Sequence, residues 1–158
     1  MTKLHNAHRR DTKPLDMGVD RETLTSWLAE YDHDKLTIGV VASHSSLQIL
    51  HGARKEGFRT LGIAVGENRR KFYQAFPGAD PDEWLILEDY REMLDYAEWF
   101  RKRNVIIVPH GSLVEYLGST NFKNLQVPTF GNRGILHWES SRQRQRDWLE
   151  AGGCDMPK

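Results

Sequence analysis

Two short polar turns carry the side chains of this sequence that are best suited to chemistry. Ser43-His44-Ser45-Ser46 directly follows one apolar run, and Pro109-His110-Gly111-Ser112 directly follows another. Imidazole and hydroxyl groups can bind polar ligands, and the free amides at a helix N-terminus favour an anion such as a phosphate. The two turns therefore indicate a ligand site, whose candidate residues are His44, Ser45, His110, Gly111 and Ser112.

Helix capping explains part of each turn without any ligand. Ser45 with Gln48, and Ser112 with Glu115, each fit the capping box, in which a serine and a residue three positions later satisfy two orphan amides. A capping box does not use an imidazole, so capping leaves His44 and His110 unexplained. On the pattern alone, the ligand site and the pair of caps both stay open.

A basic cluster follows another apolar run of strand length. Arg69, Arg70 and Lys71 come shortly after the segment 60–65. Their charges could face a phosphorylated ligand, which makes Arg69 and Arg70 candidate phosphate contacts, or they could form an ordinary solvated helix surface.

Several familiar chemistries have no pattern here. The sequence contains no G-x-G-x-x-G or P-loop motif, no G-x-S-x-G elbow and no H-E-x-x-H pair, and its one cysteine is Cys154. We therefore expect no metal site and no bound cofactor within this chain. Lysine plus arginine equals aspartate plus glutamate at 22 each, which gives no case for a nucleic-acid or membrane surface. With no signal-peptide pattern either, we expect a cytoplasmic protein.

Alternating apolar runs and helical spacings indicate how these turns are positioned. Strands are predicted at 36–42, 60–65, 83–87 and 105–108, and helices are predicted from Asp20, over 46–57, over 69–76 and over 90–100. Strands that are apolar on both faces and separated by helices indicate an α/β, doubly wound parallel sheet. Ligands of such sheets bind at the carboxyl ends of the strands, where the polar turns lie. Residues 1–18 are predicted to be a disordered leader, with Met17 as a candidate native start, and residues 19–150 are predicted to form the domain.

Three segments taken together resemble one enzyme family. ASHSSLQILHGARKEGF (42–58), IIVPHGSLVEYLG (106–118) and VPTFGNRGILHWES (127–140) are similar to the N-terminal domain of the archaeal-type formaminoimidazole carboxamide ribonucleotide (FAICAR) synthetases. These enzymes belong to the ATP-grasp superfamily, and their N-terminal domain is the Rossmann-like pre-ATP-grasp domain. The resemblance implies purine (IMP) biosynthesis, in which formate is activated by ATP as formyl phosphate and the amine of aminoimidazole carboxamide ribonucleotide (AICAR) attacks it. It also implies that His44 and Ser112 contact AICAR.

The sequence departs from the family after the third segment. The sequence given ends at AGGCDMPK, and residues 151–158 resemble the start of the linker to the ATP-grasp region. We therefore expect the ATP-grasp domains, with the sites for ATP and magnesium, to lie outside this chain. We therefore expect an AICAR-binding part that is inactive alone and needs the ATP-grasp portion in cis or in trans. The alternative is a stand-alone ribonucleotide-binding or regulatory module. Related enzymes commonly assemble as homo-oligomers, an arrangement that the sequence leaves open.

Overall fold

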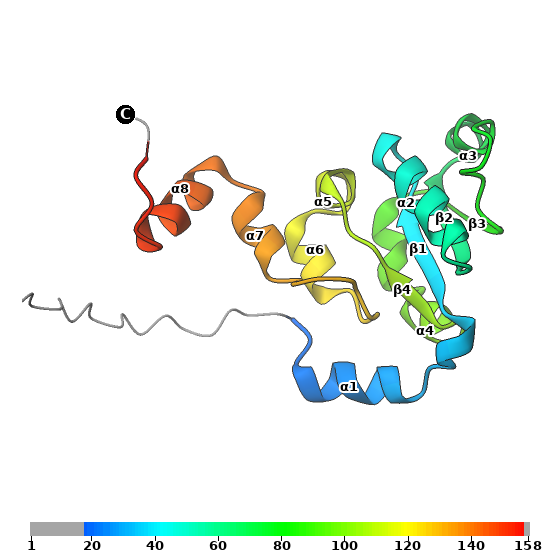
Figure 1. Cartoon of the computed structure of the whole chain (residues 1–158), viewed down its shortest axis with the longest axis horizontal. Helices are drawn as coiled ribbons and strands as arrows, with labels where there is room; N and C mark the ends of the chain where they lie inside the picture. Colours follow the sequence, from blue (N-terminus) through cyan, green and yellow to red (C-terminus); the bar gives the residue numbers. More distant parts are fainter. Residues whose placement is uncertain (1–17, 157–158) are drawn as a thin grey trace, which may run out of the picture.

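A sheet of four parallel strands forms the centre of the computed structural model, which describes residues 18–156 (Figure 1). The predicted leader and Met17 lie outside these residues, apart from Gly18. The spatial order of the strands is β3-β2-β1-β4, and β1 pairs with β2 and β4 on its two sides. Their bounds are β1 (Thr37–Val41), β2 (Arg59–Val65), β3 (Glu83–Leu87) and β4 (Val105–Ile107).

Helices connect the strands and continue past the last one. Up to β4 they are α1 (Arg21–Ala29), η1 (His33–Lys35), α2 (His44–Lys55), α3 (Glu67–Gln74), η2 (Tyr90–Leu94) and α4 (Ala97–Arg101), of which η1 and η2 are 3-10 helices. After β4 come α5 (Gly111–Leu117), α6 (Ser119–Asn124), α7 (Ile135–Glu139) and α8 (Arg142–Ala151). Within residues 18–156, no helix is long and apolar enough to cross a membrane.

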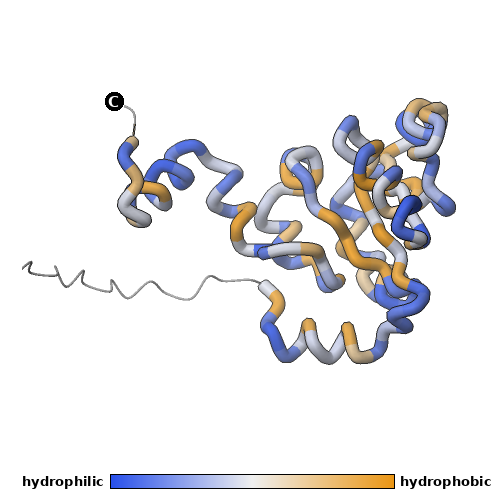
Figure 2. The backbone as a smooth tube through the Cα atoms, in the orientation of Figure 1, coloured by the Kyte–Doolittle hydropathy of each residue, from blue (hydrophilic) through white to orange (hydrophobic). Residues whose placement is uncertain are grey.

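Side chains of the strands alternate between two faces of the sheet. Val41 and Ile63 point to the face where the main core lies, which also contains residues of η2, α4, α5 and α6. Val40 and Ala64 point to the opposite face, which α2 and α3 flank through their contacts with β1 and β2. The hydrophobic strands stand out at the centre of Figure 2. Parallel strands with helices on both faces confirm the predicted doubly wound, Rossmann-like sheet.

Helix α1 begins where the sequence predicts and is anchored to the sheet by one tyrosine. Asp20 is its N-cap, and Asp20 Oδ1 accepts a hydrogen bond from the amide of Thr23 at 2.7 Å. Just after the helix, the buried Tyr31 donates its hydroxyl to the carbonyl of Val105 at 2.9 Å. Burial raises the pKa of Tyr31 above its ordinary value, so this hydroxyl remains protonated and continues to donate.

The single helix predicted over 90–100 is wrong, because two shorter elements occupy this segment. Asp89 caps η2 together with Glu92, whose Oε1 accepts a hydrogen bond from the amide of Asp89 at 3.0 Å. The chain then turns at Asp95 and Tyr96 before α4 begins. Buried residues spaced by three, such as Tyr90 and Met93, fit one face of a 3-10 helix as well as one face of an α-helix. The hydrophobic stripe was therefore compatible with both structures.

A buried arginine organises the chain after α6. Residues 128–130 run beside β4, to which they are joined by an isolated parallel bridge between Ile107 and Thr129. Arg133 is 6% exposed and donates to the carbonyls of Lys123, Leu125 and Val127, which lie around the end of α6. Beyond it, α7 and α8 extend from the body as an arm (Figure 1). The predicted domain boundary at residue 150 stays a prediction.

Candidate functional site

Two cationic or ionisable side chains meet consecutive carbonyls at the carboxyl end of β1. His110, from the turn after β4, lies 3.1 Å from the carbonyl of Val41 through its Nε2. Arg69, near the start of α3, donates from Nη1 to the carbonyl of Ala42 at 3.1 Å. Successive carbonyls of an extended strand point to opposite sides, so His110 approaches from the β4 side and Arg69 from the β2 side. The end of β1 is therefore the meeting point of three strand-end turns.

The helix caps at this end differ from the predicted ones. Helix α2 begins at His44, and its N-cap is Ser43, so the predicted box of Ser45 with Gln48 is wrong. Ser46 Oγ accepts a hydrogen bond from the amide of Ser43 at 3.0 Å, which is the return half of a capping box. Helix α5 begins at Gly111 with His110 as its N-cap, so the predicted box of Ser112 with Glu115 is also wrong. Capping therefore does not explain Ser45 or Ser112.

The structure brings most of the predicted site residues to one place. His44 is the first residue of α2 and is exposed, whereas Ser45 and the Ser112 of α5 are half-buried. His44 comes after β1 and His110 comes after β4, and these two strands pair directly with each other, which brings the two turns to neighbouring strand ends. Gly111 is exposed at the first position of α5. The polar turns after β1 and β4 thus face a common edge of the sheet, as the sequence predicts.

Buried polar atoms without a partner gather at the same ends of the strands. Within residues 18–156, the buried side-chain atoms with no hydrogen-bond partner are Ser43 Oγ, His110 Nδ1 and the hydroxyl of Tyr90. The Ser43 side chain lies at the capping position facing the amide of Ser46, and this amide donates to the Ser43 carbonyl at 3.0 Å. These residues follow β1, β4 and β3, respectively. Buried polar groups are nearly always paired in proteins, so three unpaired ones at one sheet edge indicate a place where a polar ligand binds.

His110 is held as a neutral imidazole with its acceptor nitrogen inward. A carbonyl can only accept, so Nε2 carries the proton that it donates to Val41, and Nδ1 is then an acceptor without a partner. Burial lowers the pKa of His110, the bond to Val41 partly offsets this, and the nearby His44 lowers it further. At neutral pH, His110 therefore offers a ligand an acceptor, and it does not add a positive charge.

This pKa shift makes a testable contribution to stability. The folded pKa of His110 lies below its ordinary value of 6.5, so below that value the unfolded chain binds more protons than the folded chain. The stabilising contribution is complete above the unfolded pKa and is lost as the pH falls towards the folded pKa. Urea denaturation at about pH 7.5 and about pH 5.5 should show a smaller pH-dependent loss for His110→Gln, which still donates but does not titrate. The exposed His137, replaced by Gln, is the control and should leave the loss as in the parent chain. An equal loss in His110→Gln and the parent would contradict this assignment.

Arg69 is held in place by an aromatic pair that the sequence did not reveal. Its Cζ lies 5.0 Å from the centre of the Tyr116 ring, and its Nη1 lies 3.3 Å from the Tyr116 hydroxyl. Tyr116 stacks on Tyr90, with ring centres 5.0 Å apart and planes inclined by 9°. These contacts leave Arg69 Nε and Nη2 without a hydrogen-bond partner among the described residues. Arg70 instead pairs on its own helix, with Glu67 at 2.8 Å and with Gln74.

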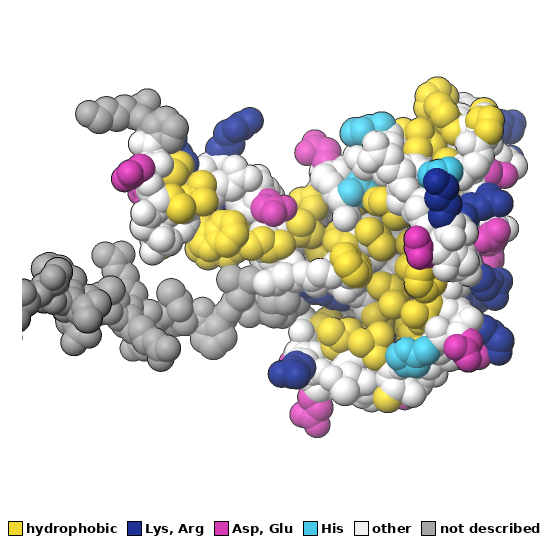
Figure 3. All heavy atoms as spheres, in the orientation of Figure 1, with side chains coloured by type: hydrophobic (Ala, Val, Ile, Leu, Met, Phe, Trp, Pro, Cys, Tyr) yellow, Lys and Arg dark blue, Asp and Glu magenta, His cyan; other side chains and the backbone are white. Residues whose placement is uncertain are grey.

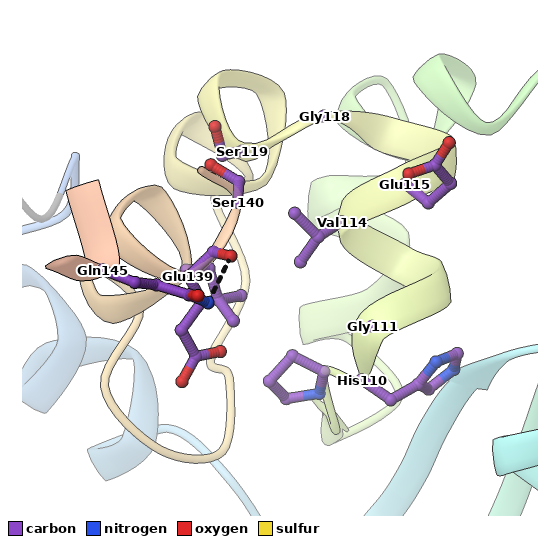
Figure 4. A pocket seen from close by; sticks show the side chains of 11 residues that line it. His110, Gly111, Val114, Glu115, Gly118, Ser119, Glu139, Ser140 and Gln145 are labelled. Carbon is purple, nitrogen blue, oxygen red and sulfur yellow. Dashed lines mark hydrogen bonds between the residues drawn. The ribbon is translucent and has the colours of Figure 1, made fainter. Parts of the chain in front are cut away.

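A cleft of about 740 Å³ adjoins this edge on the far side of α5. Figure 4 shows it between α5 and α6 on one side and the arm on the other. His110 and Gly111 line it, but the imidazole of His110 points away from it, towards β1. Glu139 of the arm lies across from α5, and its carbonyl accepts a hydrogen bond from Gln145 at 2.9 Å. The cleft is large enough for a nucleotide-sized ligand, and the turn after β4 forms part of its wall.

The described residues contain no assembled metal site. Within residues 18–156, no group of three or more histidine, cysteine, aspartate or glutamate side chains is arranged to hold a metal ion. Cys154 is a free, exposed thiol. We therefore assign no metal ligand in this part of the chain.

Comparison with solved structures gives a weak likeness. The phosphoribosylaminoimidazole carboxylase ATPase subunit from Aquifex aeolicus superposes with a TM-score of 0.49 and 16% sequence identity. The superposition covers 78% of this chain and 35% of that chain.

Comparison with sequences gives a much stronger likeness. The chain is 55% identical over 139 residues to "5-formaminoimidazole-4-carboxamide-1-(beta)-D-ribofuranosyl 5'-monophosphate synthetase 1" of Methanosarcina mazei, a FAICAR synthetase, and 44% identical over 144 residues to the synthetase of Archaeoglobus fulgidus. These matches cover 88% and 90% of this chain but only 39% of each relative. The family described as "Protein of unknown function (DUF1246)" matches residues 38–158. The resemblance to part of the FAICAR synthetases is thereby confirmed, and the chain belongs to the family described as "Protein of unknown function (DUF1246)".

Proposed function

We propose that this chain is the AICAR-binding, N-terminal part of an ATP- and formate-dependent FAICAR synthetase of purine biosynthesis. The observation that carries the proposal is the set of three buried, unpaired polar atoms at the carboxyl ends of β1, β3 and β4. Parallel α/β sheets bind ligands at this edge, and the relatives are named for a ribonucleotide product. A ribonucleotide offers hydroxyl, amide and phosphate groups that match such unpaired atoms.

Each predicted site residue has a role in this proposal. His44 and Ser112, from the turns after β1 and β4, hydrogen-bond AICAR, and Ser45 and Gly111 line the same edge. His110 supplies its inward acceptor nitrogen, held by the carbonyl of Val41. Arg69 lies on the other side of β1 with two nitrogens available for the phosphate. The sequence also predicted Arg70 as a phosphate contact, which stays untested; because Arg70 is engaged by Glu67 at 2.8 Å on its own helix, we propose Arg69 alone for the phosphate.

The contribution of this part to catalysis is to position the substrate. Holding the AICAR amine in a fixed orientation turns its reaction with activated formate into an effectively intramolecular step. ATP supplies the activation of formate and magnesium supports it, and we assign both to the part of the relatives that lies outside the match. That part acts either on the same chain or as a separate chain. We place the complete enzyme in the cytoplasm and expect it to assemble as a homo-oligomer. Alone, this chain binds AICAR without turning it over.

A thermal-shift titration of the chain with AICAR, AMP, ATP and inorganic phosphate tests the proposal. A ligand that binds only the folded state stabilises it in proportion to the logarithm of its concentration over Kd. AICAR should raise the Tm, AMP should raise it less, and ATP should leave it unchanged. His44→Ala and Ser112→Ala should each weaken AICAR binding by about 1 to 3 kcal/mol, because each removes a hydrogen bond to a charged or polar ligand.

Matched variants separate binding from folding. His137→Ala is the control for His44→Ala, and Ser26→Ala is the control for Ser112→Ala. Both residues are exposed and lie away from the ends of the strands, so both variants should leave AICAR affinity unchanged. If AICAR produces no shift, or if His44→Ala and Ser112→Ala keep full affinity while folded, the proposed site is wrong.

A further inference from the structure

An apolar groove lies on the face of the sheet opposite the main core. It has a volume of about 390 Å³ and runs over β1 and β4 beside α2. Its lining is apolar except for Glu56 at one rim. The residues that shape it are Leu36, Ile38, Phe58, Ile106, Val108 and Phe130. Figure 3 shows hydrophobic side chains gathered over β1 and β4 on this side.

The groove is open because the helices cover the two faces of the sheet unequally. On the core face, side chains of α4, α5 and α6 pack over the strands as far as β4. On the groove face, α2 and α3 contact β1 and β2, and in the described part of the chain no helix lies beyond α2. After residues 128–130, the chain leads into the arm and does not return over β4 (Figure 1). Phe130 is consequently 70% exposed and Phe58 is 38% exposed.

A parallel sheet is normally covered on both faces, so an uncovered apolar strip indicates a missing layer. An amphipathic helix that packs its apolar stripe along the strands is the usual cover for such a face, and the lining of the groove is apolar over β1, β4 and α2. The arm offers a second apolar surface, since Trp148 and Leu149 of α8 are 47% and 39% exposed and α8 buries no residue. Hydrophobic side chains over the arm and over β1 and β4 are visible from the same side in Figure 3.

We propose that this groove is the docking surface for an apolar helix of the folded unit that the relatives carry outside the match. The relatives extend well beyond this chain, because the match spans only 39% of their length. That remainder is large enough to form one or more further domains, each of which must bury apolar surface against its neighbours. A groove without a cationic lining does not suit nucleic acid. This inference goes beyond AICAR binding, because the groove lies on a face of β1 and β4 and not at their carboxyl ends.

Thiol labelling measures directly whether the groove is covered. The test uses the chain alone and a chimera in which it replaces the matched 139 residues of the Methanosarcina mazei synthetase. In both, Cys154 is replaced by serine and Phe130→Cys provides the probe, which suits a residue that is already 70% exposed. The probe should react in the chain alone and at least about tenfold more slowly in the chimera, as expected of a side chain that becomes buried. Phe72→Cys on α3, 60% exposed and outside the groove, is the matched control and should react equally in both.

Two results would overturn the proposal. Equal labelling of the Phe130→Cys probe in the chain and in the folded chimera would show that the unmatched part does not cover the groove. If the labelling rate of the chain alone fell as its concentration was raised, a second copy of the chain would cover the groove instead. AICAR binding is measured on the chain alone, so a failure of the groove and a failure of the ligand site are distinguishable.

Discussion

Replacing Arg133 with methionine is expected to lower the free energy of unfolding by about 3 to 5 kcal/mol. Arg133 is 6% exposed and donates to three backbone carbonyls, those of Lys123, Leu125 and Val127. Its Cζ also lies 5.6 Å from the centre of the Phe122 ring. Methionine fills much of the same volume but donates no hydrogen bond, so the buried Val127 carbonyl loses the donor that Arg133 supplies, while the Leu125 carbonyl keeps only the amide of Val127 at 2.9 Å.

Burying the charge of Arg133 costs free energy, which its hydrogen bonds to the carbonyls offset. Burial lowers its pKa to about 10, so the guanidinium remains protonated at neutral pH, and no ion pair among residues 18–156 neutralises it. The stabilisation therefore comes from its fork of donors, which lysine cannot reproduce, and Arg133→Lys should recover only part of the loss. Urea denaturation provides the measurement, with the exposed Arg142→Met as the control. A loss below about 1 kcal/mol in Arg133→Met would mean that water satisfies these carbonyls.

The sheet was predictable because its strands are apolar on both faces. The strand predicted over 83–87 is β3 with the same bounds, and no end of the others differs by more than one residue. Continuous apolar runs show no period of two, so their short length is what favours strands over buried helices, and the intervening helices favour parallel connections. The position of the candidate site at the carboxyl ends of the strands followed from that topology, and the turns of His44 and His110 meet there.

The local details at that edge were harder to predict. Several serines in one turn satisfy a capping pattern in more than one register, and only the extended backbone of Ser43, with φ of −157°, decides that α2 starts at His44. The same limitation applies to α5, where the N-cap is a histidine. Sequence spacing alone does not specify which backbone amide a side chain meets, so both boxes were placed wrongly.

Contacts between distant elements were not predictable at all. Arg69 and Tyr116 are 47 residues apart, and their contact depends on how α3 and α5 lie across the end of β1. Arg133 carries no sequence signal of burial, since arginine is usually exposed and its partners are backbone carbonyls that every residue has. In both cases the side-chain type was visible in the sequence, but its partners are set by tertiary structure.

Arg69→Met is expected to weaken AICAR binding by about 1.5 to 3 kcal/mol, or about 10- to 150-fold in Kd. A guanidinium binds a phosphate through charge-assisted hydrogen bonds, and Arg69 has two nitrogens left for them after its contacts with Ala42 and Tyr116. The measurement is isothermal titration of the chain with AICAR and with the matching riboside, which lacks the phosphate. The riboside should bind the parent and Arg69→Met with equal affinity, because the variant removes a phosphate contact alone.

Arg70→Met is the matched control for this comparison, since Arg70 is one residue away but is engaged by Glu67 at 2.8 Å on its own helix. It should change AICAR affinity by less than about threefold, the size of a screened surface charge effect. If Arg70→Met weakened AICAR as strongly as Arg69→Met, both arginines would bind the phosphate. If Arg69→Met weakened AICAR and the riboside equally, Arg69 would act by holding the carbonyl of Ala42 and the ring of Tyr116 in place. The phosphate would then bind elsewhere on the edge, and the helix N-terminus at His44 would be the place to look next.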